Sequence, residues 1–161
     1  MRTESIQIFK ASELPHPVKS KVLDRFRFEF CEWFDDVIKE DAEQCSNIDI
    51  LEYDLEKDYI QCKFKISAKD TAQTILENHG EICPSYSAAH AFLSALSSLE
   101  SLEDTYKNKL IDELEKGFMD QMSNYYLNML QDQYDYLTSD ENIINSLDEN
   151  NYEFLENGKR Y

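Results

Sequence analysis

Acidic side chains are the most numerous residues of this sequence that could do chemistry. The chain holds 33 Asp and Glu among its 161 residues, so a general acid–base pair is arithmetically available, but abundance singles out no pair. His79 and Cys83 are spaced more widely than the close pairs typical of metal sites. Cys83 with His79 or His90 would make a nucleophile and base, yet no third group is placed to orient them. We therefore predict a non-enzymatic protein with no metal and no cofactor.

The charge balance restricts the classes of partner. The chain has 16 Lys and Arg and a formal net charge of −17. Such a chain repels phosphates, so we expect no direct binding to nucleic acid and none to a membrane. Its three glycines lie far apart, which excludes a glycine-rich nucleotide loop. No secretory leader or CxxC pair is evident, so we expect a cytoplasmic protein with its four cysteines reduced.

The distribution of the carboxylates favours one kind of partner. Residues 117–158 contain neither Lys nor Arg. Carboxylates at helical steps of three and four lie about 5–6 Å apart, close to the phosphate spacing of a nucleic-acid strand. We predict that they bind a basic surface, with aromatic side chains as anchors. The predicted partner-binding residues are Glu29, Glu32, Asp36, Glu40, Glu43, Asp120, Tyr126, Asp132, Tyr134, Asp135, Tyr136, Asp140, Glu141, Asp148 and Glu149. Metal chelation by the acidic residues of 132–140 is disfavoured because the spacing of a calcium loop is missing.

Hydrophobic periodicity predicts the helices that carry these residues. The spacing of apolar residues predicts one helix from Val18 to about Cys45, with Trp33 and Val37 in its buried stripe. It also predicts a helix over 85–98 and a long helix reaching Leu137, with Gly117 as the place for a break. Shorter helices are predicted over 68–78, between Ser67 and a left-handed Gly80, and around residues 143–147, with a cap offered by residues 138–140.

Alternating apolar and polar residues predict the strands. Residues 51–55 and 59–67 form a predicted hairpin in which Leu55 pairs with Ile60 and Leu51 with Phe64. Short strands are also predicted at 5–9 and 152–155. The expected architecture is α+β: a small antiparallel sheet packed against several helices, including one long C-terminal helix, in a single domain over residues 1–161.

Several segments carry a resemblance to a known family. Residues 14–36 and 126–141, with the short runs 151–154 and 158–160, resemble proteins of phages and mobile elements that are often labelled as similar to an antitoxin of a toxin–antitoxin stability system. The run Tyr-Leu-Thr-Ser-Asp-Glu, which ends at Glu141, is its most distinctive part. The resemblance implies a setting inside a bacterial host cell and implies no catalytic residue.

The bacterial setting that the resemblance implies and the net negative charge together lead to three hypotheses. The first is an inhibitor that occupies the basic nucleic-acid groove of a host defence nuclease, of the anti-restriction or anti-CRISPR type, by DNA mimicry. The second is an antitoxin that neutralises a partner toxin by direct binding. The third is a small hydrolase that uses Cys83 or a carboxylate pair. The stripe of the long helix is also wide enough for a dimer seam, which leaves a homodimer open.

Overall fold

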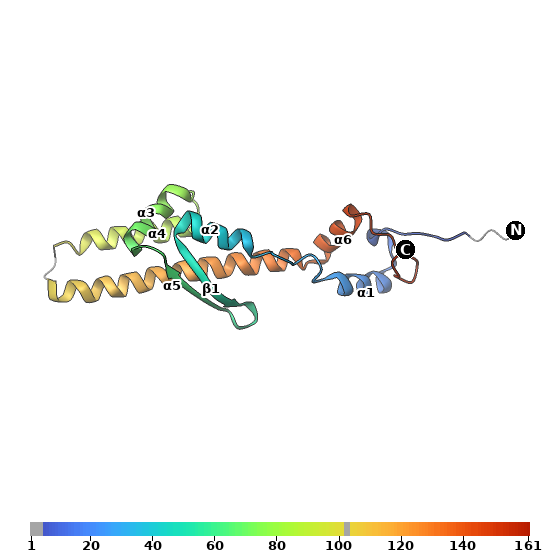
Figure 1. The fold of residues 1–161 in the computed structure, drawn as a ribbon, viewed down its shortest axis with the longest axis horizontal. Coiled ribbons are helices and arrows are strands. Elements are labelled where there is room, and N and C mark those ends of the chain that lie inside the picture. The colour runs from blue at the N-terminus through green and yellow to red at the C-terminus, as the bar shows by residue number, and fades with distance from the viewer. Residues whose placement is uncertain (1–4, 102–103) are drawn as a thin grey trace. The chain divides into compact units, whose positions relative to one another are not determined.

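Six helices and one two-stranded antiparallel sheet make up the fold that the computed structural model describes for residues 5–101 and 104–161 (Figure 1). This confirms the predicted α+β class. The long C-terminal helix is also confirmed, as α5 (Asp104–Leu137). Within the described residues, none of the helices combines the length and hydropathy that a membrane span requires.

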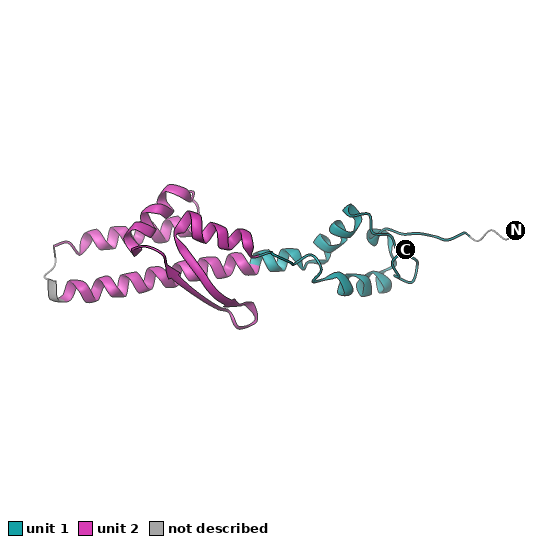
Figure 2. Ribbon diagram, in the orientation of Figure 1, with its two compact units in different colours: residues 1–34, 132–161 teal, residues 35–131 magenta. Residues whose placement is uncertain are grey.

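The contacts divide the chain into two compact units (Figure 2). Unit 1 comprises residues 1–34 and 132–161, and unit 2 comprises residues 35–131. Both ends of the chain therefore belong to the same unit. That the whole chain is a single domain stays a prediction.

Unit 1 contains a 3-10 turn, η1 (Ala11–Glu13), and the helices α1 (His16–Phe26) and α6 (Asp140–Glu149), with the last residues of α5. The helix α1 has a proline in its first turn, where the missing N–H leaves no hydrogen bond unmade. The hydroxyl of Ser139 accepts from the N–H of Asn142 and caps α6, within the segment 138–140 that the sequence offered as a cap.

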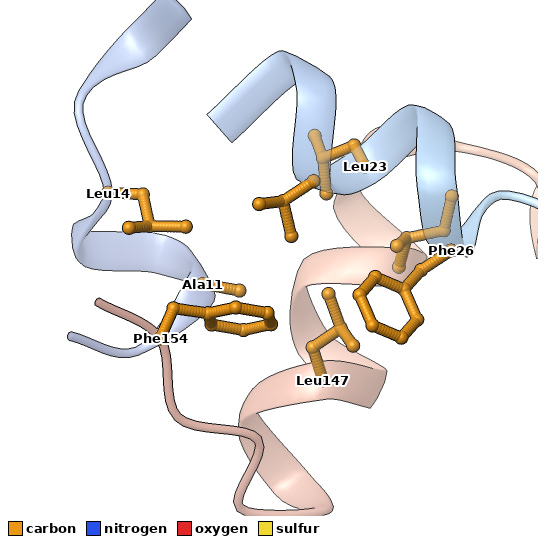
Figure 3. Packing of buried hydrophobic residues seen from close by; sticks show 8 residues of the cluster. Ala11, Leu14, Leu23, Phe26, Leu147 and Phe154 are labelled. Atoms are coloured by element: carbon orange, nitrogen blue, oxygen red, sulfur yellow. The ribbon is translucent and has the colours of Figure 1, made fainter. Parts of the chain in front are cut away.

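A cluster of buried apolar side chains forms the core of unit 1 (Figure 3). Phe26 makes edge-to-face contacts with Tyr152 and Phe154, with ring centroids 5.5 and 6.1 Å apart. Phe154 and Phe9 exchange two backbone hydrogen bonds of 2.8 and 2.9 Å. The strands predicted at 5–9 and 152–155 are thus reduced to isolated bridges. The buried members of the cluster are Ala11, Leu14, Val22, Leu23, Phe26, Ile143, Leu147 and Phe154.

Unit 2 is assembled on one face of α5. Its other elements are α2 (Asp36–Ser46), β1 (Ile48–Asp54), β2 (Tyr59–Phe64), α3 (Ala68–Asn78) and α4 (Pro84–Ser98). Phe118, Met122, Tyr126 and Leu130 follow one another on α5 at steps of four, and all are buried. The ring of Phe118 stacks with Phe92 of α4 and with Phe64 of β2, at centroid distances of 4.6 and 5.6 Å. The long helix thus provides the apolar surface that joins the sheet and α4.

The single helix predicted from Val18 to Cys45 is wrong. The helix α1 ends at Phe26 and α2 begins at Asp36. Between them, Trp33 has a left-handed φ of 62° and a side chain that is 77% exposed. Val37, predicted for the same buried stripe, is also exposed. The chain passes from unit 1 to unit 2 within this break, so the aromatic pattern belongs to two cores and not to one continuous stripe.

The predicted hairpin exists, but its register differs from the prediction. Ile48 pairs with Phe64 and Tyr53 pairs with Ile60. The side chain of Asp54 accepts hydrogen bonds from two N–H groups of the 3-10 turn η2 (Leu55–Lys57), which removes these residues from the strand. Register irregularity between Ile50 and Glu52 accompanies an exposed Leu51, which the sequence placed inside.

Two glycines also differ from expectation. Gly80 follows α3, but its backbone is not left-handed, because His79 already leaves the helix in an extended conformation. Gly117 does not break α5, which continues through it.

Gly158 provides a test of the packing in unit 1. Its φ is 79°, and an added Cβ would lie 2.8 Å from Val18 Cγ1 and 3.0 Å from Val22 Cγ2. We expect Gly158→Ala to lower the free energy of unfolding by more than about 1 kcal/mol. Gly117→Ala is the matched control, since its Cβ meets no atom within 4 Å, and should raise stability by up to about 1 kcal/mol. Urea unfolding followed by circular dichroism measures both; equal changes would contradict the packing.

Candidate functional site

Three predicted site carboxylates form a row on α2. Asp36, Glu40 and Glu43 follow one another at steps of four and three, and all three side chains are exposed. The ammonium of Lys65 pairs with Glu43 at an N–O distance of 2.5 Å. The amide of Gln44 donates to Glu40 over 2.9 Å. The row therefore presents carboxylates to solvent at helical spacing.

Glu29 and Glu32 do not extend this row, contrary to the prediction. They lie in the turns that follow α1, in unit 1, whereas α2 belongs to unit 2. Both are exposed, and Glu29 accepts a 3.2 Å hydrogen bond from the hydroxyl of Tyr152. The spacing that suggested five aligned carboxylates assumed a helix that is interrupted here.

Unit 1 places five more predicted carboxylates at its surface, on the end of α5 and on α6. These are Asp132, Asp135, Asp140, Glu141 and Glu149. Arg27, which follows α1, pairs with Asp140 at 2.8 Å and with Asp24 at 2.9 Å, and donates to the carbonyl of Thr138. Hydrogen bonds to Asp24 and then to Asp140 raise the pKa of this guanidinium. A cation from another segment therefore compensates part of the negative charge of residues 117–158, which contain no Lys or Arg of their own.

Asp148 has a structural role that the sequence did not show. Its half-buried carboxylate accepts hydrogen bonds from the backbone N–H groups of Ala11 and Ser12, at 2.8 and 3.5 Å. These donors lie at the start of η1, 137 and 136 residues away in sequence. Asp148 ties α6 to η1, a structural role that its assignment to a partner-binding surface did not include.

The charge excess is concentrated in unit 2. Twenty Asp and Glu stand there against eight Lys and Arg, whereas unit 1 has thirteen against eight. Asp120, the remaining predicted carboxylate, lies exposed on α5 in unit 2. Sequence reasoning placed the excess of negative charge near the C-terminus because it counted charges along consecutive residues and not within each folded unit.

The predicted aromatic anchors divide between surface and core. Tyr136 is 62% exposed, as predicted. Tyr134 is half-buried and packs against Phe34, with ring centroids 5.7 Å apart. Tyr126 has no exposed surface, so its prediction as a partner contact is wrong. Its four-residue step from Met122 was the signal that could have placed it in the core.

A buried chain of hydrogen bonds surrounds Tyr126 in unit 2, and sequence reasoning missed it. The hydroxyl of Tyr126 lies 2.6 Å from Ser46 Oγ and donates to Asp41 Oδ2 over 3.2 Å. Ser46 Oγ is 3.2 Å from Nε2 of His79, and Nδ1 of His79 is 2.6 Å from Ser85 Oγ. This series of hydrogen bonds connects α2, α5, the end of α3 and the start of α4. No local spacing could have revealed these contacts.

This arrangement of Ser, His and Asp is a structural network. Ser46 and Ser85 have no exposed surface, and the side chain of His79 is 5% exposed. Burial lowers the pKa of His79, although the charge of Asp41, at 3.9 Å, opposes this. Both ring nitrogens are engaged by serines, so His79 is not aimed at Cys83 as a base. Among the described residues, no three His, Cys, Asp or Glu side chains gather as a metal site.

Comparison of the chain with protein-family models, curated proteins and solved structures found no match. The resemblance to the phage-borne family therefore stays a prediction, and the site rests on the residues themselves.

Tyr126→Phe tests the buried chain. The substitution keeps the ring and removes the hydroxyl that joins Ser46 to Asp41. Because it leaves a buried polar group without a partner, we expect a loss of about 1–3 kcal/mol in the free energy of unfolding. Tyr136→Phe removes an exposed hydroxyl and should change stability by less than about 0.5 kcal/mol. Chemical unfolding of both variants measures these changes. A Tyr126→Phe protein as stable as the natural protein would contradict a stabilising role of the hydrogen-bond chain.

The lowered pKa of His79 predicts a pH dependence. The unfolded chain takes up this proton near pH 6.5, while the folded protein resists it until a lower pH. This contribution to stability is therefore complete above about pH 6.5 and is lost as the pH falls toward the folded pKa. We expect the difference in unfolding free energy between the natural protein and His79→Gln to shrink from pH 7.5 to pH 5.5. A difference that stays constant would contradict a neutral, buried His79.

Proposed function

We propose that this chain is a non-enzymatic acidic binding protein of a phage or other mobile element, acting in the bacterial cytoplasm. It occupies the basic nucleic-acid groove of a host defence nuclease, such as a restriction or CRISPR complex. The charge of unit 2 is the observation that carries this proposal, because twenty acidic residues against eight basic ones draw the protein to a cationic groove.

The row on α2 supplies the matching spacing. Successive carboxylates of Asp36, Glu40 and Glu43 are separated by one helical turn, about 5–6 Å. This distance is close to that between phosphates on a strand, so lysines and arginines that clamp a nucleic acid can pair with the row. Electrostatic attraction of this kind speeds association and weakens with salt.

Unit 1 contributes a second acidic surface with an aromatic neighbour. Asp132, Asp135 and Glu141 are exposed there, together with Tyr136. A tyrosine at the centre of a charged contact adds apolar burial that charge alone lacks. Tyr126 and Asp148 are excluded from the proposal because the fold uses them internally.

Inhibition of DNA cleavage tests the proposal. The assay uses a type I restriction enzyme and an RNA-guided CRISPR nuclease, each titrated with the full chain at several salt concentrations. We expect inhibition of at least one enzyme, and we expect the concentration for half inhibition to rise with salt. Inhibition of neither enzyme, or inhibition indifferent to salt, would contradict the proposal.

Matched variants locate the surface. Asp36→Asn, Glu40→Gln and Glu43→Gln together remove the α2 row, and we expect roughly tenfold weaker inhibition from three lost charge contacts. Asp132→Asn, Asp135→Asn and Glu141→Gln test unit 1 in the same way. Glu56→Gln, Asp58→Asn and Glu77→Gln remove three exposed charges elsewhere and should leave inhibition within about twofold. An equal loss in all three variants would indicate only a general effect of net charge.

The antitoxin hypothesis requires a different observation. Relief of a neighbouring gene's toxicity by co-expression, with no inhibition of either nuclease, would replace the present proposal with direct neutralisation of a toxin.

A further inference from the structure

The part of the α4–α5 pair between Leu93 and Gly117 has no buried core among the side chains that the structure describes. Leu93, Leu96 and Leu114 are half-buried, while Leu110 is 36% and Tyr106 is 73% exposed. Apolar side chains that a pair of helices leaves partly exposed need a further layer of protein to remove them from water.

A groove of about 270 Å³ lies on this part of the pair, between the two helices. Its lining includes Ala91 and Ala95 of α4 and Leu114, Gly117 and Gln121 of α5. Small side chains on both walls leave room for a large side chain to enter. Because Leu110 and Gly117 are two helical turns apart, the exposed Leu110 continues the same face of α5.

Gly117 leaves a notch in this groove that the chain itself does not use. An added Cβ would meet no atom within 4 Å, so no close contact inside the chain requires a glycine. Glycine is unfavourable in the interior of a helix relative to alanine. The notch is therefore open to a side chain from outside.

The charges beside the groove alternate in sign. Lys109, Glu113, Lys116 and Asp120 follow one another at steps of four, three and four on α5, and the side chain of each is exposed. Within the chain, Lys109 and Glu113 are 4.0 Å apart. If two copies of α5 lie antiparallel about an axis near Leu114, Lys109 faces Asp120 and Glu113 faces Lys116. A parallel pair would set each charge against its like.

The apolar contact fits the same antiparallel direction. The midpoint between Leu110 and Gly117 lies one residue from the midpoint of the charge row, so Leu110 of one copy lies beside Gly117 of the other, where the helix has no side chain.

We propose that two copies of this chain pair along this face of α5, antiparallel, with Leu110 of each copy entering the notch at Gly117 of the other. The row of Lys109, Glu113, Lys116 and Asp120 fixes the direction. This pairing is independent of the proposed inhibition of a nuclease and needs no other partner.

Sedimentation equilibrium of the full chain tests the pairing. We expect the natural protein to be a dimer at micromolar concentration. Gly117→Leu fills the notch with a better helix former, so we expect the dimer Kd to rise at least tenfold while the circular dichroism spectrum is retained. A natural protein that is monomeric throughout, or a Gly117→Leu protein that dimerises unchanged, would overturn the proposal.

Charge reversal tests the direction. One variant carries Lys109→Glu and Asp120→Lys, and the other carries Lys109→Glu and Glu113→Lys, so both keep the net charge of the natural protein. The first keeps unlike charges face to face in an antiparallel pair and should dimerise like the natural protein, whereas the second sets like charges against one another in both pairs and should be monomeric. Equal dimerisation of the two variants would contradict the antiparallel pairing.

Discussion

The buried face of α5 is the constraint on which unit 2 depends. Its apolar side chains recur every four residues from Phe118 to Leu130. Because an α-helix has 3.6 residues per turn, each step moves this stripe about 40° around the axis. Phe118 consequently meets the sheet and α4, while Tyr126 meets α2. One helix thereby contacts elements that approach it from different directions.

Placing a tyrosine at the centre of this face imposes a second requirement. A buried phenol is stable only when its hydroxyl is hydrogen-bonded, and its partner must then be satisfied in turn. Here the requirement passes from Tyr126 to Ser46, then to His79, and ends at Ser85. The helix ends of unit 2 are therefore positioned by directional bonds in addition to apolar packing. In this relay both ring nitrogens of His79 contact serines, and both of these serines are buried.

The sequence predicted what local spacing controls. The helix over 68–78, the cap at Ser139 and the hairpin were found because their signals lie within a few residues of one another. The break after α1 was missed since no proline or glycine marks it, and Trp33 takes up the left-handed turn. Of the candidate site, helical steps identified the α2 row correctly. The capping of η1 by Asp148 depends on a contact across 137 residues, which periodicity cannot report.

The order of the two units along the chain has a consequence for synthesis. Unit 2 is contiguous, whereas unit 1 needs residues before 35 together with the thirty residues from 132 to 161. On a ribosome, unit 2 has its complete sequence while Phe9 still awaits Phe154. The amino-terminal segment must wait with its apolar side chains unpaired until Ile143, Leu147 and Phe154 have been synthesised. Loss of residues 140–161 would leave the sequence of unit 2 complete, but it would remove Ile143, Leu147 and Phe154 from the core that the amino-terminal segment needs.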